Sequence, residues 1–221
     1  MTLIIRAVNK QKIAFFSDGK ITSKCITPEN GVQKVFKNAK GTACVGIGGF
    51  IKTFDRGSHF PNSFNLPMEI IELSNEENYI DSILNTTKTI YNEKSRALDS
   101  IFLYSSIENG NFEHNVSKVI KEDGKNVGTN ILHIKPKFIE LNGVKFDLNF
   151  SYYNFQGDLN EEVSHLKKLF ELDKKEMLKM IDKYYQNING QTIGNKLETY
   201  CLGNLEKGFY ELGSYQRSKT T

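Results

Sequence analysis

Two Asn-Gly pairs divide the middle of the chain into strand-like runs. The pairs are Asn109-Gly110 and Asn142-Gly143, and the runs beside them are 101–107, 112–120, 131–141 and 144–153. Asn and Gly tolerate the positive φ angles that both central residues of a type I′ turn require. Each pair therefore predicts a hairpin, and together they commit this part of the chain to antiparallel sheet.

Apolar spacing predicts the remaining elements. Strands are expected at 3–8, 12–17, 34–38, 42–47, 197–202 and 209–212. A helix follows the Ser74-x-x-Glu77 capping box as far as Tyr91, and two more begin at Asp158 and Asp173. After Gly48-Gly49 a helix of only a couple of turns is expected, because Gly57, Pro61 and Pro67 interrupt the stretch that follows.

The elements alternate as blocks of strands, helices, strands, helices and strands. Two antiparallel sheets packed face to face, with a helical layer outside each, would bury the apolar stripes of the helices. We therefore expect an α+β protein with a four-layer αββα sandwich. The 221 residues suit one domain over 1–212, followed by a frayed polar tail at 213–221.

Composition excludes several classes of function. The net charge of +3 is spread without a basic cluster, so nucleic acid is not an expected partner. The three cysteines lack metal-ligand spacing, which indicates a reduced compartment, no metal site and no cofactor. Neither a charged leader with an apolar segment nor a membrane-length apolar run is present, so we expect a cytoplasmic protein without a membrane partner.

The first 49 residues carry the candidate chemistry. Thr2 follows Met1, and removal of Met1 would give Thr2 a free α-amine beside its hydroxyl. The amine, with a reference pKa of about 7.7 to 8.0, suits the role of general base. Lys34 would favour the neutral amine, Asp18 would hold Lys34 charged, and the backbone near Gly48 would receive an oxyanion. A turn centred on Lys10 would place Thr2 opposite Asp18, although a bulge would shift this register by one residue.

These four residues are separated by sixteen, sixteen and fourteen positions. With this spacing, and with the segments Ser17-Asp18-Gly19-Lys20, Gln33-Lys34-Val35 and Gly46-Ile47-Gly48-Gly49, the sequence resembles the N-terminal nucleophile hydrolases, specifically proteasome β subunits and the bacterial HslV peptidase. The resemblance implies an αββα fold, a threonine peptidase that cleaves peptides or unfolded proteins through an acyl-enzyme, and a homo-oligomeric ring with a possible ATP-dependent unfoldase. It also implies a substrate pocket lined by Ile21, Val32, Gly46 and Phe50.

The sequence departs from that family in the second half of the chain. The family's supporting Gly-Ser-Gly has no match, because Phe155-Gln156-Gly157-Asp158 stands in its place, and the later aspartate segment is represented only by 189–195. Two alternatives to the peptidase therefore stay open. The chain is a catalytically inactive proteasome-like subunit that acts in assembly or partner binding, or it is a stand-alone hydrolase of small-molecule amides.

Overall fold

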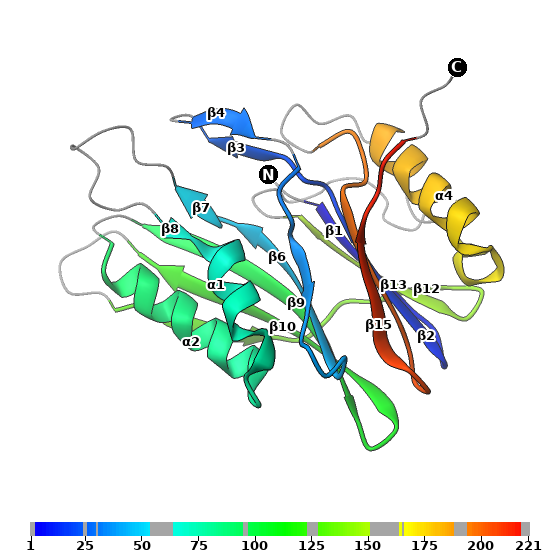
Figure 1. Ribbon diagram of the computed structural model, residues 1–221, viewed down its shortest axis with the longest axis horizontal. Coiled ribbons are helices and arrows are strands. Elements are labelled where there is room, and N and C mark those ends of the chain that lie inside the picture. The colour runs from blue at the N-terminus through cyan, green and yellow to red at the C-terminus, as the bar shows by residue number, and fades with distance from the viewer. Residues whose placement is uncertain are drawn as a thin grey trace.

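The computed structural model describes residues 3–23, 26–29, 31–53, 64–94, 97–122, 128–150, 164, 166–187 and 194–217. Within these ranges the chain forms two larger antiparallel sheets and two short ribbons (Figure 1). The six-stranded sheet has the order β12 (Ile139–Leu141), β13 (Val144–Phe150), β1 (Leu3–Val8), β2 (Lys12–Ser17), β14 (Thr199–Asn204) and β15 (Gly208–Ser214). The five-stranded sheet has the order β11 (Asn130–Ile134), β10 (Asn111–Lys121), β9 (Leu98–Glu108), β6 (Ala43–Gly49) and β5 (Val35–Lys37). The ribbons pair β3 (Ile21–Ser23) with β4 (Ile26–Glu29) and β7 (Lys52–Thr53) with β8 (Phe64–Asn65).

Helices cover the outer face of each sheet. Figure 1 shows α1 (Leu66–Glu72) and α2 (Tyr79–Asn92) outside the five-stranded sheet and α4 (Lys174–Asn187) outside the six-stranded sheet. Short 3₁₀ turns, η1 (Leu73–Asn75) and η2 (Leu169–Glu171), precede α2 and α4. Separate apolar clusters lie between the two sheets, beneath α1 and α2, and beneath α4. Three cores between four layers confirm the expected αββα sandwich.

Both Asn-Gly pairs form the predicted turns. Asn109 and Gly110 have φ angles of 50° and 75°, and Asn142 and Gly143 have 51° and 74°. The run 131–141 was expected to be one strand, and this is wrong, because β11 belongs to the five-stranded sheet and β12 to the six-stranded sheet. Pro136 lies between them, and proline cannot donate a ladder hydrogen bond, so the chain leaves one sheet and joins the other.

The first hairpin is shifted by one residue from the expected register. Ile4 pairs with Ser17 and Val8 with Ile13, so the strand positions place Leu3, and not Thr2, opposite Asp18. The turn explains the shift, because the side-chain oxygen of Asn9 accepts hydrogen bonds from the amides of the two residues beyond Lys10. The turn is therefore centred between residues 10 and 11.

The observed helices agree with the predicted ones at α4 and differ at the start of α2 and after Gly49. Asp173 accepts a hydrogen bond from the amide of Glu176 at 2.9 Å, as expected for the start of α4. The prediction that Ser74 begins a helix with a capping box is wrong, because Ser74 lies in η1 and α2 begins only at Tyr79. A helix directly after Gly49 is also wrong, because β7 follows, and 54–63 lie outside the described residues. The predicted helix from Asp158 falls largely on residues that are not described.

The end of β15 lies beyond the predicted strand. The strand continues through Ser214, and the amide of Tyr215 donates to the carbonyl of Glu198 at 2.8 Å. Arg217 then forms an ion pair with Asp182 of α4 at 2.7 Å. The first residues of the expected tail are therefore attached to the sandwich.

A buried arginine joins the two sheets. Arg6 of β1 contacts Asp147 of β13 at 2.6 Å, and its other terminal nitrogen donates to the carbonyl of Tyr104 in the opposite sheet at 2.7 Å. His114 lies beside this pair, with its Nδ1 2.8 Å from Ser105 Oγ. Burial, and then the positive charges of Arg6 and Lys145, lower the pKa of His114 to about 4.

This pKa predicts a loss of stability in mild acid. The unfolded chain, in which the pKa of a histidine is about 6.5, binds more protons than the folded chain between about pH 6.5 and 4. As the pH is lowered through this window, the free energy of unfolding should therefore decrease. The decrease should be smaller in His114→Gln. Urea unfolding at pH 7 and at pH 4.5 measures the difference, and parallel decreases in the two proteins would contradict the prediction.

Candidate active site

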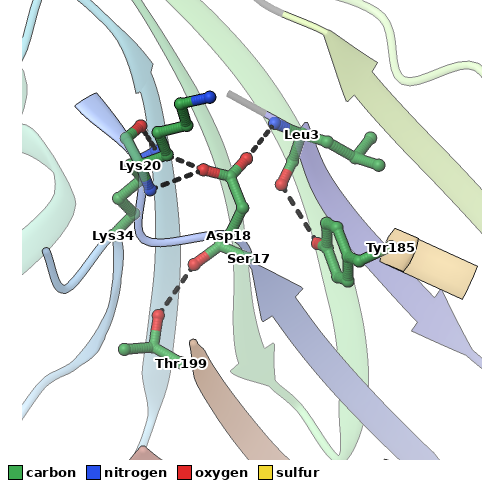
Figure 2. A network of polar contacts seen from close by, with 7 residues as sticks. All are labelled: Leu3, Ser17, Asp18, Lys20, Lys34, Tyr185 and Thr199. Atoms are coloured by element: carbon green, nitrogen blue, oxygen red, sulfur yellow. Dashed lines mark hydrogen bonds and ion pairs between the residues drawn. The ribbon is translucent and has the colours of Figure 1, made fainter. Parts of the chain in front are cut away.

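The carboxylate of Asp18 is the centre of the polar network at one end of the sandwich. Asp18 follows the last residue of β2 and is fully buried. Its Oδ2 accepts the backbone N–H of Leu3 at 2.8 Å, and its Oδ1 accepts the side-chain amine of Lys34 at 2.7 Å and the N–H of Lys20 at 2.9 Å (Figure 2). One carboxylate thus connects the start of β1, the turn after β2 and the start of β5.

Lys34 is held from two directions. It precedes β5, its side chain is fully buried, and its amine also donates to the carbonyl of Lys20 at 2.6 Å. Burial lowers the pKa of Lys34, and the charge of Asp18 and the hydrogen bond to it oppose that effect. The charged state of Lys34 therefore depends on Asp18.

Thr2 lies outside the described residues, and the nearest described backbone group is the N–H of Leu3. The N–H of Leu3 belongs to the peptide group that joins residues 2 and 3, and this N–H is the one that Asp18 accepts. The structure therefore brings together Asp18, Lys34 and the backbone N–H of Leu3. The catalytic roles of these residues stay predictions.

Gly48 lies in β6, directly opposite Ile101 of β9. The next residue, Gly49, has a φ of +94°, and a Cβ there would lie 2.5 Å from the carbonyl oxygen of Asp99. The positive φ and the close approach to Asp99 are enough to require glycine at position 49, with no catalytic role. The amide of Gly48 as an oxyanion donor stays a prediction.

The four residues expected to line a substrate pocket have different surroundings. Val32 belongs to the core beneath α1 and α2, and Phe50 packs against that core. Gly46 faces the opposite sheet, where a Cβ would lie 2.7 Å from Cγ2 of Ile4. Ile21 is in β3, and its side chain is not among those described. Their role in binding substrate stays a prediction.

Several residues surround Asp18 in addition to those expected at the site. Tyr185 of α4 donates its hydroxyl to the carbonyl of Leu3 at 3.1 Å, and Ser17 Oγ lies 2.7 Å from Thr199 Oγ1 (Figure 2). Glu198 lies against Gly19, where a Cβ would be 2.5 Å from its Cγ. These contacts join residues that are about 180 positions apart in the chain, so no local pattern could have indicated them.

The described residues contain no cluster of three or more His, Cys, Asp or Glu side chains that could hold a metal ion. In the same part of the chain, none of the helices has the length and apolar composition needed to span a membrane.

Comparisons with known proteins give structural likeness only. No protein-family model matches the chain, and no curated protein matches it. A (Gly-1) mutant of Anbu from Hyphomicrobium sp. strain MC1 superimposes with a TM-score of 0.51 at 7% identity, covering 100% of this chain and 90% of that chain. Anbu from the same strain gives 0.51 at 8% identity, covering 99% and 88%. Anbu (ancestral beta-subunit) from Yersinia bercovieri gives 0.51 at 7% identity, covering 96% and 86%.

These likenesses establish an αββα fold shared with the Anbu structures and correct the family suggested by the sequence. The identification as a proteasome β-subunit or HslV-like member of the N-terminal nucleophile hydrolases is wrong, because no family model matches and the similar structures are Anbu proteins at 7 to 8% identity. The glycines that contributed to the resemblance have packing causes of their own. Gly46 makes room for Ile4, and Gly49 adopts a positive φ beside Asp99.

The packing at Gly46 predicts a measurable cost. Gly46→Ala would place a methyl group against Ile4, which is itself fully buried, so we expect a loss of about 1 to 3 kcal/mol in the free energy of unfolding. Gly128→Ala is the control, because a Cβ there has no neighbour within 4 Å, and its effect should stay within about 0.5 kcal/mol. Urea unfolding compares the two. Equal effects would contradict the close packing of the sheets at Gly46.

Proposed function

We propose that this protein is an N-terminal-threonine amide hydrolase that cleaves peptide bonds through an acyl-enzyme on Thr2 after removal of Met1. The observation that carries the proposal is the Asp18 carboxylate, which binds the Leu3 amide at 2.8 Å and the Lys34 amine at 2.7 Å. One buried carboxylate thus binds both the Lys34 cation and the N–H of Leu3, the residue that follows Thr2 in the sequence. Such an arrangement suits a nucleophile whose own amine must be neutral to act as base.

In the proposed reaction, Thr2 Oγ attacks the carbonyl carbon of the substrate and its α-amine accepts the hydroxyl proton. The positive charge of Lys34 lowers the pKa of that amine and stabilises the negative charge that develops nearby. The amide of Gly48 donates to the oxyanion. The C–N bond then breaks as the leaving amine takes the proton, and water releases the acyl group from the Thr2 ester, which restores the hydroxyl.

The partners follow from the fold and from the proposed chemistry. We expect peptides or unfolded proteins as substrates, and copies of this chain assembled into a ring, because the structures it resembles include one described as an ancestral beta-subunit. A pocket formed by Ile21, Val32, Gly46 and Phe50 would favour apolar side chains on the acyl side of the cleaved bond. A cytoplasmic location and an ATP-dependent unfoldase are part of the same proposal.

The first experiment asks whether Thr2 becomes the N-terminus and reacts. A peptidyl epoxyketone needs both a hydroxyl and an α-amine, so we expect one adduct on residue 2 of the wild-type protein. Thr2→Ser keeps both groups and should be labelled, whereas Thr2→Ala should not. Intact-mass spectrometry of the native protein measures the loss of Met1 and the adduct together.

Two results would contradict the proposal. Retention of Met1 in the native protein would leave the amine of Thr2 blocked. A mature protein that begins at Thr2 and takes no label would favour an inactive subunit that acts in assembly. If labelling succeeds, size-exclusion mass distinguishes a ring from a stand-alone hydrolase, because only the latter would be a monomer.

A further inference from the structure

An N-terminal nucleophile has a single covalent connection to its protein. In the reaction proposed above, Thr2 would be attached only through its peptide bond to Leu3. The groups that hold Leu3 therefore determine where the hydroxyl and the amine of Thr2 can lie. An error of about 1 Å in the position of a reacting group can cost a factor of roughly 100 in rate.

Side chains from two different layers hold the backbone of Leu3. Asp18 accepts its N–H at 2.8 Å, and the hydroxyl of Tyr185 donates to its carbonyl oxygen at 3.1 Å. Figure 2 shows these contacts on the two polar groups of the same residue. Asp18 comes from the end of β2, whereas Tyr185 comes from α4, which covers the outer face of the sheet.

The position of Tyr185 is itself fixed. Its side chain is fully buried in the core beneath α4, and its ring packs edge-on against that of Tyr184 at 6.5 Å between centroids. Asp182, one turn earlier on α4, accepts the amide of Leu197 at 2.9 Å and pairs with Arg217 at 2.7 Å. The second half of α4 is thereby attached to the chain on both sides of the strand pair β14–β15.

The chemistry of the phenol suits a permanent donor. Burial and the nearby charge of Asp18 raise the pKa of Tyr185 well above its usual value, so the hydroxyl keeps its proton. A phenylalanine would fill almost the same apolar space. The hydroxyl is then the part of this side chain that acts on Leu3.

We infer that Tyr185 is a positioning residue for the N-terminal nucleophile, acting through the carbonyl of Leu3. This inference rests on the proposed function, because it concerns the placement of Thr2 as the reacting residue. With Asp18 on the N–H and Tyr185 on the carbonyl, Leu3, the residue to which Thr2 is bonded, is held at both of its backbone polar groups. The helix α4 thereby becomes part of the site's geometry without touching the substrate.

The test compares two hydroxyl deletions in the same core. Tyr185→Phe removes the donor to Leu3. Tyr200→Phe is the matched control, because Tyr200 belongs to the same apolar cluster and its hydroxyl donates to Glu211, at 2.8 Å, and not to Leu3. The probe is the peptidyl epoxyketone, and the readouts are the maximal rate of adduct formation, the half-saturating probe concentration and the melting temperature. We expect Tyr185→Phe to lower the maximal rate about tenfold while the half-saturating concentration stays within about twofold. Tyr200→Phe should leave both kinetic values within about twofold.

The outcomes separate this inference from the proposed function. A wild-type maximal rate in Tyr185→Phe, or an equal loss in Tyr200→Phe, would overturn the role of Tyr185 while the adduct on residue 2 upheld the function. A mature wild-type protein without adduct would overturn both. If Tyr185→Phe does not fold, the test uses 4-aminophenylalanine at position 185, because this residue keeps an N–H donor in the para position. We expect its rate within about threefold of wild type, and a tenfold loss would overturn the inference.

Discussion

The geometry of the site depends on one buried carboxylate that serves two partners. Asp18 and Lys34 are both fully shielded from water, and burial of either ion alone would cost several kcal/mol. The cost is offset because Asp18 accepts three N–H groups, and Lys34 donates to Lys20 as well as to Asp18. The same carboxylate that keeps Lys34 charged also binds the peptide group next to Thr2. The Asp18 carboxylate therefore sets both the charge of Lys34 and the position of the Leu3 backbone.

The sandwich around this group explains why the contact can form. The register of the first hairpin places Leu3 opposite Asp18, and the short β5 begins immediately after Lys34. The two sheets approach closely where Gly46 meets Ile4, a distance that any side chain at position 46 would increase. The sheets are further joined by Arg6, which binds Asp147 in its own sheet and the carbonyl of Tyr104 in the other. The site therefore lies at the end of an interface that is fixed by apolar contacts and by a hydrogen bond from Arg6.

Local patterns predicted the elements, and contacts between distant segments decided what those patterns could not. The Asn-Gly turns, α4 and the strand pairs follow from backbone preferences, so they were predictable from short stretches. The one-residue shift of the first hairpin depends on hydrogen bonds of the Asn9 side chain, and the change of sheet after β11 depends on Pro136. Asp18 and Lys34 were expected to meet, whereas Tyr185, Glu198 and Thr199 reach the site from more than 150 residues away. The family suggested by the sequence was wrong, because no family model matches and the similar structures are Anbu proteins at 7 to 8% identity. Two of the glycines behind that resemblance, Gly46 and Gly49, have packing causes.

The most direct test of the account is a double-mutant cycle between Asp18 and Lys34. Asp18→Asn, Lys34→Met and the double variant are compared in mature protein, and the measured quantity is the rate of acylation of Thr2 by the epoxyketone. One carboxylate both keeps Lys34 charged and holds the peptide bearing Thr2. We therefore expect the factor by which the second substitution lowers the acylation rate to be at least about ten times smaller when the first substitution is already present. Losses that simply multiply would contradict the account, because they would mean that the two residues act independently.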